Sequence, residues 1–109
     1  MNKEEIKIGI LFLLSHSNEN WLDEKFADNG FTFLEIMEFL KLNNVSIDYK
    51  ELKILLDEME DEGLFEERHF GKELMGRVDY DIETPGAKLL EKQDMSKLEK
   101  KWRLPEFVT

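Results

Sequence analysis

The chain of 109 residues contains no cysteine and only two histidines. Without thiols it forms no disulfide, binds no metal through thiolates and has no cysteine nucleophile. His16 and His69 lie far apart, and neither has a second histidine at the spacing of a zinc site. Phosphate-binding glycine-rich loops and the Gly-x-Ser-x-Gly turn of hydrolases are also missing from the sequence. We therefore expect no enzyme activity, no cofactor and no metal site.

Long apolar segments are missing as well. The apolar run Ile8–Leu14 is far shorter than the roughly 20 residues that a membrane-spanning helix needs. Glu4 and Glu5 precede this run and no small-residue cleavage site follows it, which argues against a signal peptide. We expect a buried first helix, no contact with membranes and a cytoplasmic location.

Positive charge is scarce in the first part of the chain. The whole chain has 15 Lys and Arg against 25 Asp and Glu, a formal net charge of −10. Residues 1–66 hold six basic and sixteen acidic residues, whereas residues 67–109 hold nine of each. An acidic excess repels phosphate backbones and attracts basic surfaces. It also keeps a protein in solution, and the sequence leaves that simpler interpretation open.

The periodicity of the apolar residues predicts a mainly helical domain with one small β-hairpin. Three helices come first, then two strands and a last helix, over residues 4–16, 32–42, 48–62, 64–70, 78–82 and 84–102. A short extended link at residues 45–47 joins the second helix to the third, and a loop at residues 71–76 closes the hairpin.

Helix boundaries have clear local signals. Thr32 and Glu35 have capping-box spacing, and Asp48 and Glu51 repeat it one helix later. Gly63 is placed to end the third helix. In the last helix Thr84 is expected as the N-cap, with Pro85 in the first turn. The expected core face of the third helix comprises Tyr49, Leu52, Leu55, Leu56 and Met59.

Two phrases of the sequence resemble the winged helix-turn-helix domains of the PadR-like transcriptional regulators. These are LDEMEDEGLF at residues 56–65 and YDIETPGAKLL at residues 80–90, and the likeness covers residues 31–92. Glu83 and the insert around Trp21 depart from the family pattern. The resemblance implies a three-helix core, a two-stranded wing and a C-terminal helix.

The same resemblance implies a function. Members bind double-stranded DNA with the third helix in the major groove and the wing on the backbone, and many form homodimers through a C-terminal helix. It divides the chain into a winged-helix domain at residues 1–92 and a dimerisation segment at residues 93–109. The residues that carry this dimer contact would be Met95, Leu98 and Trp102.

Candidate DNA contacts lie at the start of the third helix and on the hairpin. They are Tyr49, Lys50, Lys53, Arg68, His69, Lys72 and Arg77. Phosphate and base contacts are made mainly by Arg, Lys, Asn and Gln. The alternative for the hairpin cations is that they balance acidic residues across the two strands.

The outward face of the third helix favours another function. Between Asp48 and Glu62 there are seven acidic and two basic residues, and the outward face carries Ile54, Asp57 and Asp61. Carboxylates next to phosphates are repelled. A second hypothesis is therefore an acidic winged-helix module that docks on a basic protein partner, as a small phage or viral inhibitor would.

Overall fold

The computed structural model describes residues 1–16, 30–69, 71–72, 78–106 and 108. Within this part the chain is mainly helical, with five helices and one two-stranded antiparallel sheet. Their order is α1 (Lys3–Leu14), α2 (Phe33–Leu42), α3 (Tyr49–Asp61), β1 (Phe65–His69), β2 (Val78–Ile82), α4 (Thr84–Glu91) and α5 (Met95–Lys101). The expected mainly helical fold with one hairpin is confirmed, while the insert around Trp21 lies outside the described residues.

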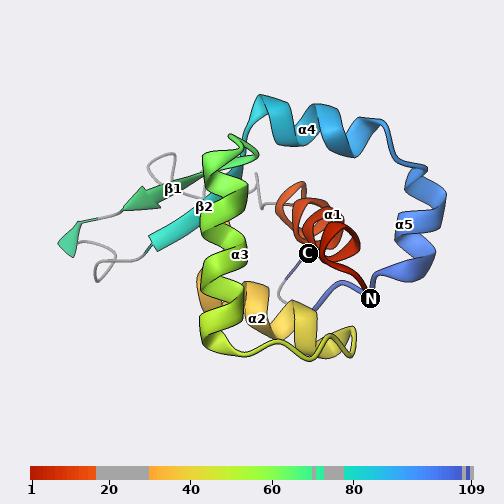
Figure 1. The fold of residues 1–109 in the computed structure, drawn as a ribbon, viewed down its shortest axis with the longest axis horizontal. Coiled ribbons are helices and arrows are strands. Elements are labelled where there is room, and N and C mark those ends of the chain that lie inside the picture. Colours follow the sequence, from red (N-terminus) through yellow and green to blue (C-terminus); the bar gives the residue numbers. More distant parts are fainter. Residues whose placement is uncertain (17–29, 70, 73–77, 107, 109) are drawn as a thin grey trace.

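Helix α1 occupies the centre of the molecule, and the other helices surround it (Figure 1). Its residues from Gly9 to Leu14 are all buried, as the nearly uninterrupted apolar run predicts. The side chain of Asn2 begins the helix by accepting the N–H of Glu5 at 2.9 Å. Lys7 is also buried, and its ammonium lies 2.6 Å from the carboxylate of Glu62 at the end of α3.

The predicted capping box of α2 is confirmed, and for α3 the Asp48 half of the predicted box is found. The Thr32 hydroxyl accepts the N–H of Glu35, whose carboxylate in turn accepts the N–H of Thr32, so the full capping box is present. The Asp48 carboxylate accepts the N–H of Glu51 at 2.7 Å. Residues 45–47 link the two helices without forming a strand.

Gly63 turns the chain from α3 into the hairpin. Its φ of +74° lies in the left-handed region that favours glycine. The N–H of Leu64 donates to the carbonyl of Met59, and the N–H of Gly63 donates to that of Glu60, which together form a Schellman motif. The expected helix end at Gly63 is confirmed.

Strands β1 and β2 form the expected antiparallel hairpin. Phe65 pairs with Ile82 at its base, and His69 pairs with Val78 toward its tip. Phe31 adds a short bridge to the other edge of β2, where it exchanges two backbone hydrogen bonds with Tyr80. The hairpin extends from the helical body beside α3 (Figure 1).

The C-terminal part differs from the expected single helix. Helix α4 ends at Glu91, and a second helix, α5, begins at Met95 because the Asp94 carboxylate accepts the N–H groups of Ser96 and Lys97. The prediction of Thr84 as N-cap is also wrong. Thr84 is already helical, and the cap position is taken by Glu83, which offers no side-chain hydrogen bond to the helix.

The end of α5 returns the chain to the core. Trp102 is 2% exposed, and its indole stacks on Phe39 with ring centroids 5.3 Å apart. Gly9 of α1 lies directly under this indole, since a Cβ at Gly9 would come within 2.3 Å of the ring. Leu98 is buried in the same cluster, whereas Met95 is 40% exposed. Two of the three residues expected at a dimer contact therefore contribute to the core of their own chain, and the homodimer stays a prediction.

Candidate functional site

The outward face of α3 is as the sequence predicts, apart from one residue. Ile54 is 52% exposed, and Lys50, Asp57 and Asp61 are exposed with it. Tyr49, expected on the core face, is 65% exposed. It occupies the first turn of α3, where its ring packs against Phe33 of α2 with centroids 4.6 Å apart. The prediction of Tyr49 as a core residue is therefore wrong.

Two lysines of α1 neutralise part of the acidic charge of α3. Lys3 lies 2.5 Å from the Glu58 carboxylate, and Lys7 lies 2.6 Å from that of Glu62. The hydrogen bond from Lys3 lowers the pKa of Glu58 below its ordinary value. Together with the two lysines of α3, four ammonium groups face the seven carboxylates of residues 48–62. The face keeps a surplus of negative charge.

Lys53 of α3 also forms an ion pair within the chain. Lys53 lies 3.4 Å from the carboxylate of Asp57, one turn further along α3. Burial works to lower the pKa of Lys53, but Tyr80, Asp57 and Glu67 outweigh it and raise that pKa above its ordinary value. The ammonium is thus held by acidic neighbours within the chain.

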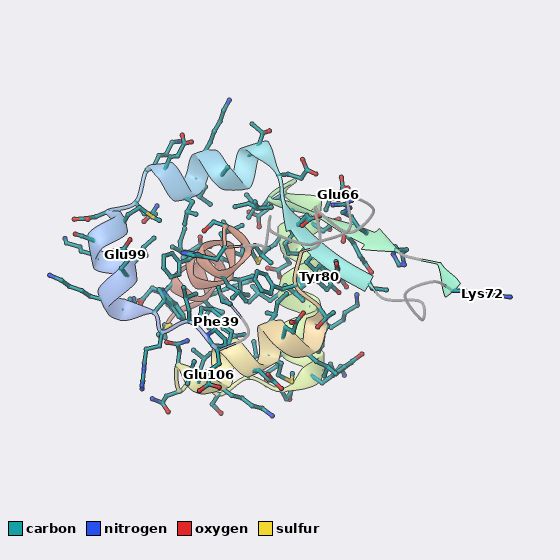
Figure 2. All side chains as sticks on the ribbon, turned by 180° about the vertical axis from the view of Figure 1, so that it is seen from behind. Phe39, Glu66, Lys72, Tyr80, Glu99 and Glu106 are labelled. Atoms are coloured by element: carbon teal, nitrogen blue, oxygen red, sulfur yellow. The ribbon has the colours of Figure 1, made fainter. Side chains whose placement is uncertain are left out.

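Two of the candidate hairpin residues, Arg68 and His69, lie beside carboxylates of the strands, whereas Lys72 does not. The guanidinium of Arg68 forms an ion pair with Asp81 on β2 and lies 3.9 Å from Glu66. His69 lies 3.4 Å from Glu67. Lys72 is exposed at the far end of the hairpin, with its side chain pointing away from the molecule (Figure 2). Arg77 lies outside the described residues.

Carboxyl groups meet where α3 adjoins the hairpin. Burial raises the pKa of Glu60 above its ordinary value, and a hydrogen bond with Glu67 of β1 raises it further. On the opposite face of the hairpin, a hydrogen bond with Glu66 of β1 raises the pKa of Glu83, the residue that follows β2, and burial adds to this effect. The nearby carboxylates contribute to both shifts, because each negative charge disfavours ionisation of its neighbour. Glu60 and Glu67, which we call the α3–hairpin corner, thus place two carboxyl groups together where α3 meets β1, with Asp57 and Lys53 nearby.

The described residues contain no other arrangement that suggests chemistry. His16 follows the end of α1, where its ring packs edge-on against Phe12 and its Nδ1 lies 2.8 Å from the Phe12 carbonyl. Among the residues described, no group of three or more His, Cys, Asp or Glu is placed to hold a metal ion. The helices of the described segments are all too short or too polar to cross a membrane.

Comparison with protein-family models, with curated proteins and with solved structures gives no match to this chain. The geometry and charge of the surfaces of α3 and the hairpin are therefore the only indications of function in the described residues.

Proposed function

We propose that this chain is a winged-helix domain that acts as a protein-interaction module. The order of its elements supports this fold: a central helix, the short Phe31 bridge, a capped helix pair and a hairpin beside the second helix of that pair. The two phrases that resemble PadR-like regulators also meet in space. A Cβ at Gly86 would come within 2.1 Å of the Leu64 carbonyl oxygen, so the start of α4 packs tightly against the entry to the hairpin.

The charge of the surface shared by α3 and the hairpin carries the functional part of the proposal. In a DNA-binding winged helix this surface faces the duplex and needs cations that neutralise phosphates. Here Arg68 and Lys53 are engaged by carboxylates of the same chain, and the α3–hairpin corner brings Glu60 and Glu67 together. Such a surface repels phosphates and attracts a basic partner. We infer that α3 docks on a basic surface of another protein.

A DNA-binding regulator is the second candidate, favoured by two lysines. Lys50 at the start of α3 and Lys72 at the end of the hairpin are exposed and form no ion pair with any described residue. Two phosphate contacts supply little affinity, because non-specific binding strengthens with each phosphate that is neutralised. Charge therefore favours the protein partner.

Reversal of two charges on α3 tests the proposed docking surface. The Asp57→Lys/Asp61→Lys variant is expected to retain a basic partner from a host-cell lysate at least about tenfold less well than the wild-type chain, because repulsion replaces attraction at the contact. Retention is measured by quantitative mass spectrometry after capture at about 150 mM salt, where long-range attraction between exposed charges is largely screened.

Glu91→Lys/Glu99→Lys is the matched control, because it changes the net charge by the same amount. Both residues are exposed; Glu99 lies in α5, which Figure 1 shows on the other side of α1 from α3, and Glu91 ends the neighbouring α4. The control is expected to retain the same partner as well as the wild type. Equal losses in the two variants would mean that net charge alone governs retention, and the α3 docking surface would be refuted.

A further inference from the structure

A small apolar groove lies between α1 and the outward face of α3. Its volume is about 230 Å³, and its lining residues are Lys3, Ile6, Ile47, Glu51, Ile54, Leu55 and Glu58. Ile6, Ile47 and Leu55 form its apolar floor, and Ile54, which is half exposed, forms one wall. The Ile54 side chain therefore exposes apolar surface to water beside the groove.

The size of the groove limits what it holds. Pockets that bind small molecules usually measure about 300–1,000 Å³, so this groove is too small for a typical ligand. It is large enough for one large apolar side chain of another protein. Anchors of this kind, inserted into small pockets, dominate the affinity of protein interfaces.

The rim of the groove sets the charge of its occupant. Glu51, Ile54 and Glu58 follow one another at i, i+3 and i+7 on α3, and this spacing puts all three on one face of the helix. A carboxylate therefore lies about 4.5 Å before Ile54 along the helix axis and another about 6 Å after it. Lys3 shares the rim but is already engaged by Glu58.

We propose that this groove binds a cationic amphipathic helix of a partner protein. One large apolar residue of that helix inserts beside Ile54. A Lys or Arg residue about one turn away on one side pairs with Glu51, and another on the other side takes the place of Lys3 at Glu58. This inference rests on the proposed function and adds the recognition element within the basic partner. A second copy of this chain is a poor occupant because it carries ten surplus negative charges, and an anionic lipid surface is repelled for the same reason.

A synthetic peptide tests this proposal directly. The probe is a helical peptide of about four turns with a Lys-x-x-Leu-x-x-x-Lys core and neutral flanks, labelled with a fluorophore for anisotropy titrations at about 50 mM salt. We expect saturable binding to the full chain that weakens about tenfold with Ile54→Ala, because the variant removes the wall of the groove. Leu34→Ala is the matched control, since Leu34 is 68% exposed on α2 outside the groove, and its binding should equal that of the wild type.

A second peptide distinguishes binding in the groove from non-specific attraction between opposite charges. It keeps both lysines and replaces the leucine with serine, and we expect it to bind about tenfold more weakly than the first peptide. Equal binding of the two peptides, or equal effects of Ile54→Ala and Leu34→Ala, would overturn the groove proposal and leave acidic docking in place. No binding of either peptide would also overturn it. The proposed function itself is tested separately, by the comparison of the Asp57→Lys/Asp61→Lys and Glu91→Lys/Glu99→Lys variants.

Self-association is the remaining outcome of the test. Sedimentation equilibrium of the wild-type chain and of Ile54→Ala distinguishes a partner helix from a second copy in the groove. We expect the same mass for both. A dimer that dissociates on Ile54→Ala would assign the groove to a second copy and contradict the proposal.

Discussion

Trp102→Ala is expected to lower the free energy of unfolding by about 3–5 kcal/mol, the usual cost of removing a large aromatic side chain from a core. The indole is 2% exposed, stacks on Phe39 and covers Gly9 of the central helix. Its removal leaves a cavity between α1 and α2 that the rigid helices cannot close. Urea denaturation, with the wild type and the variant measured side by side, gives the difference.

Met95→Ala is the control within the same segment. Met95 is 40% exposed, and we expect a loss of less than about 1 kcal/mol because little apolar contact is removed. If Trp102→Ala instead cost less than about 1 kcal/mol and converted a dimer into a monomer, Trp102 would belong to an interface between two chains. The placement of Leu98 and Trp102 in the core of their own chain would then be wrong.

Gly86→Ala is expected to destabilise the fold by about 2–3 kcal/mol or more, although it adds a single methyl group. A Cβ at this position would lie 2.1 Å from the carbonyl oxygen of Leu64 and 3.1 Å from a methyl of Leu11. The carbonyl belongs to the backbone and accepts the N–H of Glu83, so it cannot move away without breaking that hydrogen bond. The start of α4 must shift instead, and the thermal midpoint should fall by more than about 8 °C.

Gly71→Ala introduces the same methyl group where there is room for it. A Cβ at Gly71 meets no atom of the described residues within 4 Å, and the φ of Gly71 is not in the left-handed region. We expect no loss, or a gain of about 0.4–1 kcal/mol from a less flexible unfolded chain. Similar destabilisation by Gly86→Ala and Gly71→Ala would contradict the tight packing of α4 against Leu64.

The features that the sequence predicts correctly depend on neighbours a few residues away. The capping box of Thr32 and Glu35, the Asp48 cap and the left-handed Gly63 each join groups within one or two turns of chain. The outward position of Ile54 likewise follows from helical periodicity alone.

The incorrect predictions involve packing between distant segments or competition between adjacent local signals. Tyr49 has the spacing of a core residue, but it lies in the first turn of α3, beyond the end of the core, and packs on Phe33. The apolar stripe that ends at Trp102 has the spacing of a single helix. Instead, the Asp94 cap starts a new helix, and Trp102 at its end packs against α1 and α2. Glu83 takes the cap position expected for Thr84, and its N–H is held by the Leu64 carbonyl.

The sequence predicts the sign of the charge on the candidate site, but it does not predict which charged residues pair with one another. The count of acidic residues in α3 predicts a negative face, and hairpin cations such as Arg68 were expected to balance acidic residues as one alternative. The ion pair of Lys7 with Glu62 joins residues 55 positions apart, and no periodic pattern indicates it. The contact of Glu60 with Glu67 depends on the turn at Gly63, which folds β1 back beside the end of α3.

Binding to random-sequence duplex DNA tests most directly whether the surface of α3 and the hairpin serves a basic protein. The titration uses fluorescence anisotropy at about 50 mM salt with the chain at up to about 100 µM, enough for half-saturation or more by typical non-specific DNA binders. We expect no binding by the wild-type chain and no change with Lys50→Ala or Lys72→Ala. Saturable binding that weakens with salt and with each of these two substitutions would contradict the account.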